Sequence, residues 1–490
     1  MKNMAMKLLA LVVALGLSAA MLPEPVEAKK QSKRGRVIAS GVRLRLYRLG
    51  APNKVRVISF SRSATPTLDT MLATNELPGR ERVSSMARRR GAIAAINGDY
   101  SRPSGRPVFT FARDGRLDQT GAIDPATGGY LRGRNFAIDI YKKRTFFSKP
   151  KTRAWIWIPS QDGGKSREVH RVNDQSFKGQ ASKQIRAFTA VGGKEARPPH
   201  GGCYVRLRAA GRRKAVEPTH APVDGDGVPL ATAGVEQRHF VQKRTCRYKR
   251  VPPKDGITLY SPRKGKRAKI LRSMTVGTTA KYGWSFGWPK VFDSVGGNPT
   301  LIEDGVVQKH SIYTGTSFAG GRHPRTAVAY NSKNHKLFLV TVDGRQPGYS
   351  VGMTLAGLTH FLRSRLGATD ALNLDGGGST TMVVKGKVKG RPSDGSERPV
   401  SSALVLLPGA DPGEPSQPAA PLLELAPSPE IPTPSPQIPT PDGSPYDLMT
   451  EDPASVGGMS AWLEDQGHEL PGFLQRAADN FEASRQPATE

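Results

Sequence analysis

Two aspartates in the C-terminal half of the chain each follow an apolar segment and precede a glycine. Asp343 stands in VDGRQ after KLFLVTV (336–342), and Asp375 stands in LDGGGST after ALNL (371–374). Carboxylates are groups that enzymes use as general acids, general bases or nucleophiles. A single Asp-Gly pair is better explained as the start of a turn. Two such pairs, one on each side of a helical segment, favour a site.

A run of three glycines follows Asp375 and is the most unusual stretch of the chain. Consecutive glycines adopt positive φ and let main-chain N–H groups approach an anion, to which neighbouring hydroxyls add hydrogen bonds. The segment is not a P-loop, because no Gly-Lys-Ser/Thr follows and GxGxxG is absent. A flexible hairpin turn is the alternative interpretation. The candidate substrate-binding residues here are Gly376, Gly377, Gly378, Ser379 and Thr380.

Two segments of the chain repeat one short pattern. RRGAIAAINGD (89–99) and RLGATDALNLD (365–375) both run from a helix end through Gly-Ala and an apolar strand to Asn-x-Asp. Eleven residues are too few to establish a duplication. The pattern nevertheless predicts that Asn97 and Asp99 lie at the end of a strand, as further substrate-binding candidates. Arg325, in GGRHPRTAVAY (320–330), is a candidate phosphate ligand because arginine forms bidentate hydrogen bonds with phosphate, although a surface basic run is the alternative.

The elements that would position these residues form an α+β fold with a mixed sheet. Alternation of apolar and polar residues predicts strands at 36–48 and 54–60, and a helix is expected at 80–90, before Gly91 and a buried strand. A strand–helix–strand unit, Lys336 to Leu374, carries the candidate site. Its helix begins after Thr354 and ends at Gly367. If its strands are parallel neighbours with a right-handed crossover, both aspartates lie at one sheet edge, where such sheets bind ligands. A hairpin at 381–390 and a strand at 401–407 complete the expected domain, 36–407.

The N-terminus predicts export. Lys2 and Lys7 precede an apolar stretch, and small residues follow, which is the order of a secretory signal peptide, here placed at 1–28. A retained anchor helix is the alternative. We found no later segment apolar enough to cross a membrane, so the mature protein is expected to be secreted, either soluble or associated with the cell wall.

The chain has only two cysteines, Cys203 and Cys246, which cannot fill a Cys₄ metal site. In an oxidising compartment two cysteines most simply form a disulfide, and two free thiols are the alternative. Both lie in a basic, poorly periodic region at about 176–254. The sequence predicts a loop-rich insertion there, stapled by the disulfide.

Charge divides the 490-residue chain into unlike parts. The formal net charge is +32, but the residues from Pro408 onward contain 14 acidic and 2 basic side chains, so the rest carries +44. We expect a basic leader at 29–35, a Pro-rich linker at 408–446 and an acidic tail at 447–490 with a possible short helix. The charge favours a polyanionic partner. Nucleic acid is not expected, because aromatics make up 7% and do not interleave with the basic residues.

Several motifs, in order along the chain, resemble the phosphodiester glycosidase family. They are AINGDY (95–100), VGGNPTLIEDG (295–305), RTAVAY (325–330), VTVDGRQ (340–346), the 352–383 run and PSDGSERPVSSAL (392–404). The resemblance implies a mixed α+β domain that hydrolyses a sugar-1-phosphodiester. It also implies export in bacteria, with wall or surface glycopolymers as the usual suggested substrates.

By position, the resemblance assigns the polar site to Asn97, Arg325, Asp343, Arg345, Asp375 and the 376–380 turn. Many members of the family have glycine where this chain has Asp99. Asp375 or Asp343 is expected to act at the anomeric carbon. Arg325, Arg345 and the glycine amides are expected to hold the leaving phosphate, which needs little help from a general acid.

Two alternatives use the same residues or charges differently. Asp343, Asp375, Glu303 and Asp304 offer oxygen ligands for Ca²⁺ or Mg²⁺, although the chain contains no EF-hand or HExxH spacing. No other cofactor is expected. The alternative function is that of a non-catalytic, basic protein that binds the cell wall or another anionic polymer. The sequence does not specify the oligomeric state.

Overall fold

The computed structural model describes most of the chain between Gly35 and Gly409. The described residues are 35–50, 52–121, 133–139, 142–159, 164–174, 184–193, 197–211, 214–216, 234–247, 251, 253, 256–308 and 320–409. The predicted signal peptide, linker and acidic tail lie outside the described residues, apart from residues 408 and 409 of the linker. Among the described helices, none has the length and apolar character needed to cross a membrane.

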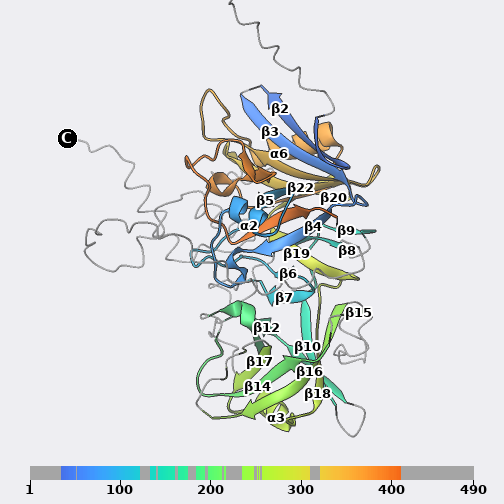
Figure 1. The fold of residues 1–490 in the computed structure, drawn as a ribbon, viewed down its shortest axis with the longest axis vertical. Coiled ribbons are helices and arrows are strands. Elements are labelled where there is room, and N and C mark those ends of the chain that lie inside the picture. Colours follow the sequence, from blue (N-terminus) through green and yellow to red (C-terminus); the bar gives the residue numbers. More distant parts are fainter. Residues whose placement is uncertain are drawn as a thin grey trace, which may run out of the picture. The chain divides into compact units, whose positions relative to one another are not determined.

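An eight-stranded sheet holds the strands that end at the candidate site (Figure 1). In spatial order its strands are β1 (Arg36–Ala39), β2 (Val42–Leu49), β3 (Asn53–Ser61), β23 (Lys336–Val342), β22 (Arg325–Asn331), β24 (Asp370–Asn373), β20 (Thr300–Glu303) and β21 (Val306–Val307). The strands predicted at 54–60, 336–342 and 371–374 are confirmed. The segment predicted as strand at 36–48 forms two strands, β1 and β2, because Ser40 and Gly41 make a turn in which Gly41 has a φ of 69°.

The strands of the predicted strand–helix–strand unit, β23 and β24, are not neighbours. β22 lies between them and pairs antiparallel with both, with Arg325 opposite Val342 and Ala327 opposite Asn373. The expectation of adjacent parallel strands was therefore wrong, because a strand from earlier in the chain is inserted. Both strands still run in the same direction. Asp343 and Asp375 consequently follow strands that end at one sheet edge, the edge where β22 begins.

Helix α6 (Leu355–Leu366) connects β23 to β24 and covers one face of this sheet. The Thr354 side chain accepts a hydrogen bond from the Gly357 amide at 3.0 Å, and Gly367 ends the helix with a left-handed φ of 64°. Both predicted helix ends are confirmed. Leu358 and Leu362 pack with Ala327 and Val340 in one buried cluster. The helix therefore packs directly on strands β22 and β23.

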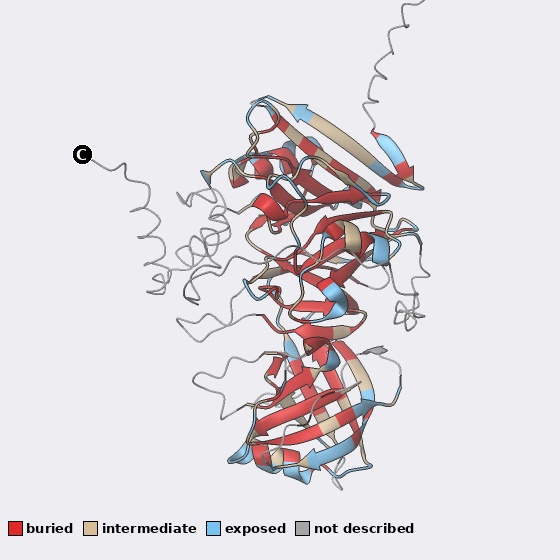
Figure 2. Cartoon of the chain, turned by 60° about the vertical axis from the view of Figure 1, so that its left-hand side comes forward, coloured by how far each residue is buried: buried red, intermediate tan, exposed pale blue. Residues whose placement is uncertain are grey.

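The other face of the eight-stranded sheet packs on a five-stranded sheet, here called the β5 sheet. Val328 and Leu372 share a buried cluster with Ile96 and Leu404. Most of the strand residues in this part of the molecule are buried, and they are coloured red in Figure 2. Helix α2 (Val83–Arg89) covers the far face of the β5 sheet. In spatial order the β5 sheet contains β26 (Lys387–Lys389), β25 (Met382–Val384), β5 (Ala94–Asn97), β27 (Ser402–Leu407) and β4 (Thr67–Leu72). The predicted hairpin, final strand and helix near 80–90 are confirmed.

Two further sheets complete the described fold. The five-stranded β19 sheet contains β7 (Arg116–Gln119), β6 (Phe111–Arg113), β19 (Val291–Gly297), β8 (Arg134–Asp139) and β9 (Thr145–Phe146). The nine-stranded sheet contains β11 (Lys165–Val169), β10 (Arg153–Ile158), β18 (Thr279–Ser285), β16 (Gly234–Thr245), β14 (Gly202–Ala209), β17 (Ile257–Pro262), β13 (Arg186–Thr189) and β12 (Arg171–Val172), with β15 (Lys214–Val216) paired to β16. The remaining helical segments are α3 (Lys266–Ser273), η1 (Ala73–Asn75), η3 (Ala190–Gly192) and η4 (Gly377–Ser379).

The region at about 176–254 is not loop-rich where the structure describes it. It supplies β13, β14, β15 and β16 to the nine-stranded sheet, and β16 alone is 12 residues long. Its alternation is partly hidden in the sequence, because exposed positions of β14 and β16 carry arginine and lysine and a bulge interrupts their pairing. The fold class is confirmed as α+β. The nine-stranded sheet is mixed, since β12 and β13 pair in parallel.

Cys203 and Cys246 form the predicted disulfide, which joins residues 43 apart in the sequence. The bond connects the beginning of β14 to the chain just beyond β16. It therefore fastens two neighbouring strands of the nine-stranded sheet.

Replacing both cysteines by alanine is expected to lower the free energy of unfolding by about 4 kcal/mol, because a loop of this length gains that much conformational freedom in the unfolded chain. Urea denaturation measures the difference. Wild-type protein kept under reducing conditions serves as the control and should match the double variant. An unchanged urea midpoint would contradict the prediction.

Candidate active site

The ends of β5 and β24 meet and hold each other through buried asparagines. Asn97 donates from Nδ2 to the Asp375 carbonyl at 2.7 Å, and its Oδ1 accepts from Thr326 and from the Thr381 amide. The Asp375 amide donates to the Gly98 carbonyl at 3.1 Å. Asn97 is fully buried, so it positions the Asp375 backbone. The structure thus places Asn97 at a strand end, as predicted, with its side chain directed at protein groups.

Asn373, the counterpart of Asn97 in the sequence pattern, anchors a tyrosine beside Asp375. Its Nδ2 donates to the Tyr100 hydroxyl at 2.7 Å and to the Asn298 carbonyl at 2.8 Å, and the Tyr100 hydroxyl also donates to that carbonyl. Burial raises the pKa of Tyr100, and the nearby Asp375 carboxylate adds to this, whereas Arg325 opposes it. Tyr100 therefore stays protonated and forms a fixed wall close to both Asp375 and Arg325.

Arg325 begins β22 and is fully buried. Its Nε donates to the Met353 carbonyl at 2.9 Å and its Nη2 to the Gly321 carbonyl at 3.0 Å. Burial lowers the pKa of Arg325 to about 10, Tyr100 acts in the opposite direction, and Arg345 lowers the pKa further. Arg325 remains a cation at neutral pH. The two guanidinium groups are close enough to repel each other, which favours an anion near them.

Arg345 reaches the glycine turn from the loop after β23. A side-chain carbon on Gly377 would lie 3.1 Å from Nη2 of Arg345. Arg345 itself has a φ of 57°, in the left-handed region, and its Nε donates to Nδ1 of His323 at 3.4 Å. A non-glycine residue in this conformation carries backbone strain, which is common at functional sites. The structure therefore brings Arg345 to the 376–380 turn and close to Arg325.

Asp343, by contrast, is engaged elsewhere. Its Oδ2 accepts from Arg56 at 2.6 Å and from the Tyr349 hydroxyl at 2.8 Å, and its side chain is 5% exposed. These contacts hold the loop after β23 to β3. Oδ2 of Asp343 is thus held in a buried ion pair. A structural role explains it better than attack on a substrate.

The glycine turn is packed from two sides. The Gly377 amide donates to the Pro324 carbonyl, and the Ser379 and Thr380 amides donate back within the turn, so these three amides are not available to a phosphate. A side-chain carbon on Gly378 would lie 2.1 Å from Oδ2 of Asp394 and 2.2 Å from Nη2 of Arg398. The expectation that the Gly377 amide holds phosphate was therefore wrong. The glycines instead allow close approach of β22 and of the Asp394–Arg398 ion pair.

Asp99 is a buried carboxyl group behind the site. Its Oδ2 accepts from the Phe109 amide at 2.8 Å, and within the described residues its Oδ1 has no hydrogen-bond partner. Burial raises the pKa of Asp99 well above its ordinary value, against the effect of its backbone hydrogen bonds, and the charge of Asp375 raises it further. Asp99 is fully buried, so it supports the wall of the site and does not line an open surface.

Replacing Asp99 by asparagine is expected to stabilise the protein increasingly as the pH rises. An aspartate whose folded pKa is raised loses stability from its unfolded pKa of about 4 up to its folded pKa, and asparagine avoids this loss. The melting temperatures of wild type and Asp99→Asn, compared at pH 4.5 and pH 8, measure the effect. A difference between the two proteins that does not change with pH would contradict the raised pKa.

The predicted metal ligands do not come together. Asp304 follows β20 at the opposite sheet edge, where its amide contacts Asp370, so neither Glu303 nor Asp304 joins Asp343 or Asp375. Among the described residues, three carboxylates cluster elsewhere: Asp69, Asp114 and Asp293. Arg90 lies 2.9 Å from Asp69 and 3.7 Å from Asp114, and burial raises the pKa values of Asp69 and Asp293. The Arg90 guanidinium thus already supplies a positive charge to this cluster.

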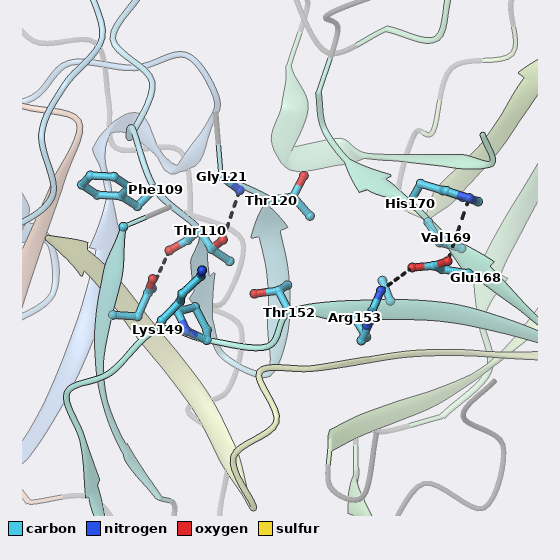
Figure 3. Close-up of a pocket in the computed structure, with 14 residues that line it drawn as sticks. Phe109, Thr110, Thr120, Gly121, Lys149, Thr152, Arg153, Glu168, Val169 and His170 are labelled. Atoms are coloured by element: carbon cyan, nitrogen blue, oxygen red, sulfur yellow. Dashed lines mark hydrogen bonds and ion pairs between the residues drawn. The ribbon is translucent and has the colours of Figure 1, made fainter. Parts of the chain in front are cut away.

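A cavity of about 330 Å³ lies between the β19 sheet and strands β10 and β11 (Figure 3). Thr110, Asn135, Lys149 and the ion pair of Arg153 with Glu168 line it. Phe109 also lines it and, through its amide, binds Asp99. None of the predicted catalytic residues lines this cavity, so we do not place the reaction there.

Sequence reasoning missed several residues of this region: Tyr100, Asn298, Asp394 and Arg398. Each was inside a quoted motif, and Tyr100 directly follows Asp99 in AINGDY. A tyrosine one residue beyond a candidate carboxyl was the available signal. No spacing rule would have indicated that Asp394 and Arg398 pack on Gly378.

The C-terminal half of the described chain matches the model of a known protein family. Residues 231–407 match the family model described as phosphodiester glycosidase. This part of the chain therefore carries a phosphodiester glycosidase domain, which confirms the resemblance seen in the motifs. The matched segment contains Arg325, Arg345 and Asp375, whereas Asn97 and Asp99 lie outside it.

Individual proteins are similar to this chain to different extents. A crystal structure of a hypothetical protein from Synechocystis is 19% identical, with a TM-score of 0.50 over 74% of this chain and 61% of that one. The zebrafish N-acetylglucosamine-1-phosphodiester alpha-N-acetylglucosaminidase catalytic domain is 15% identical over 75% of this chain and 82% of its own, with a TM-score of 0.36. The SPbeta prophage-derived uncharacterized protein YomE of Bacillus subtilis is 39% identical over 85 residues. The chain spans 13% of YomE, so that match concerns one segment only.

Proposed function

We propose that this protein hydrolyses a sugar-1-phosphodiester and releases the sugar from its phosphate. The observation that carries the proposal is the position of Asp375. Its backbone is fixed by Asn97 and Gly98, and it lies with Tyr100, Arg325 and Arg345 at one sheet edge. One carboxylate beside two cations is the combination that this reaction needs.

In the proposed reaction the bond between the anomeric carbon and the bridging oxygen breaks, and that oxygen leaves with the phosphate. Asp375 acts at the anomeric carbon, either directly or by taking a proton from the attacking water. Arg325 and Arg345 stabilise the negative charge on the departing phosphate. Tyr100 remains neutral and excludes water from one side of the carboxylate. Asp343 and Asn97 hold the loops that carry these groups.

We include export in this proposal. The Cys203–Cys246 disulfide is the structural observation in its favour, because disulfides persist in oxidising compartments. A cell-surface or cell-wall glycan joined by phosphodiesters is then the proposed substrate class. The large positive charge of the body would keep the protein near such a polymer.

A chromogenic sugar-1-phosphodiester tests the proposal. Purified protein should convert it to free sugar and the phosphate monoester of the chromogenic alcohol. The free sugar is detected by a coupled sugar oxidase or by chromatography. A panel of sugars identifies the preferred one. Absence of sugar release across the panel, together with salt-sensitive binding to anionic polymer, would instead support the non-catalytic, polyanion-binding alternative.

A further inference from the structure

Three basic side chains gather around one tyrosine next to the candidate site. Lys54 Nζ lies 3.4 Å from the ring centroid of Tyr349, and the Arg391 guanidinium carbon lies 4.2 Å from the same centroid. Arg56 donates to the Tyr349 hydroxyl at 3.2 Å and to Asp343. We call Lys54, Arg56, Tyr349 and Arg391 the Tyr349 cluster. Arg48 is near enough to influence the charge of Lys54.

The charges of this cluster do not balance. Asp343 is the carboxylate that the described contacts place among Lys54, Arg48, Arg56 and Arg391. Partial burial lowers the pKa of Lys54, and repulsion from Arg391, Arg48 and Arg56 lowers it further. Gathering like charges costs free energy unless a counter-charge joins them. Arg391 is exposed, so an anion from solution has access to it.

The Tyr349 cluster shares a loop with the candidate active site. Residues 343–353 connect β23 to the start of α6, and this loop carries Asp343 and Tyr349 as well as Arg345, which reaches Gly377. Gln346 in the same loop donates to the Arg391 carbonyl at 3.0 Å. Gly390 adopts a φ of 100°, and a side-chain carbon there would lie 2.5 Å from Asp343 Oδ1. The turn bearing Arg391 is thus fitted closely to the loop that serves the site.

We propose that the Tyr349 cluster is a second anion subsite, which binds the next phosphate of a phosphodiester-linked chain whose scissile phosphate lies at Arg325 and Arg345. This inference rests on the proposed function, and it specifies a repeating polyanion as the substrate. Lys54 and Arg391, held on the Tyr349 ring, supply the charge. Arg56 is neutralised by Asp343 and holds the ring in place.

Two matched substrates test the subsite. One is a sugar-1-phosphodiester of glycerol, and the other carries a further phosphate on that glycerol. Wild type is expected to prefer the second substrate, by kcat/KM, about tenfold, since an interaction with one or two charged donors has that magnitude. The double variant Lys54→Met with Arg391→Met should lose this preference. Lys54→Met alone should lose part of it, which covers the case in which the double variant does not fold.

The control removes two positive charges elsewhere. Arg363 and Arg365 lie on exposed positions of α6, and Arg363→Met with Arg365→Met should keep the wild-type preference. An equal loss in this control would show that net charge, and not the Tyr349 cluster, selects the substrate. That result, or an unchanged preference in the cluster variants, would overturn the proposal.

A binding experiment separates this inference from the proposed reaction. Calorimetric titration with a synthetic trimer of glycerol phosphate is expected to show at least tenfold weaker binding to the cluster double variant than to wild type or to the α6 control. Trimer binding of this kind without turnover of either substrate would contradict the hydrolase and retain the subsite. Turnover of the substrates with equal trimer binding in all three proteins would support the hydrolase and contradict the subsite.

Discussion

Replacing Asp375 by asparagine is expected to lower kcat on a sugar-1-phosphodiester by about 10³-fold, within the range for removal of an acid, base or nucleophile. The backbone contacts of Asp375 with Asn97 and Gly98 do not involve its carboxylate. Asparagine has nearly the same shape, so the turn should form unchanged. Steady-state kinetics measures the loss, and thermal unfolding should show a melting temperature within about 2 °C of wild type.

A matched substitution at the other sheet edge supplies the control. Asp304 also precedes a glycine after a strand, and its φ of 49° is one that asparagine tolerates. Asp304→Asn should therefore retain wild-type kcat. Wild-type turnover by the Asp375→Asn protein would remove this carboxylate from the reaction and leave the proposed mechanism without its central group.

Replacing Arg325 is expected to have the second-largest effect, a loss of about 10²-fold in kcat/KM for Arg325→Lys and more for Arg325→Met. Lysine keeps the charge but has a single nitrogen, so it cannot reproduce the fork by which Nε and Nη2 of Arg325 donate to the Met353 and Gly321 carbonyls. Because the proposed role is charge stabilisation of the leaving phosphate, the loss should be smaller for substrates whose leaving group is more acidic. Kinetics with a series of leaving groups measures this trend.

The neighbouring Arg322 is a suitable comparison for Arg325. It is exposed, three residues away and of the same charge, so Arg322→Met should reduce kcat/KM by less than about threefold, as expected for an exposed charge. If the loss for Arg325→Met were the same for every leaving group, Arg325 would have a purely structural role.

Local sequence signals predicted the elements that carry the site. Thr354 and Gly367 identified both ends of α6, alternation identified β2 and β3, and an apolar segment identified β23. Apolar segments ending in Asn-x-Asp identified β5 and β24. These signals are reliable because capping, glycine conformation and strand periodicity depend on residues close together in the chain.

Side-chain partners were not predictable, because they depend on which strands become neighbours. Asp343 had the same local context as Asp375, yet it pairs with Arg56, which is 287 residues away. The residues of β23 and β24 likewise carry no local signal that β22 lies between these two strands. Burial of Asp99 follows from the close packing of Phe109 and Ser402 around it, and neither residue is near it in the pattern that singled it out.

The last strand of the fold has a consequence for the order in which the protein is made. β27 lies between β5 and β4 and pairs with both. The hydroxyl of Ser402, on β27, accepts a hydrogen bond from the Asp99 amide. The segment that ends in Asn97 therefore lacks one of its two neighbouring strands until the chain has been synthesised as far as Leu407. While a ribosome or a translocation channel still holds those final residues, Asn97 and Asp99 lack their contacts with β27, so the proposed activity would begin only once this strand is free to join the sheet.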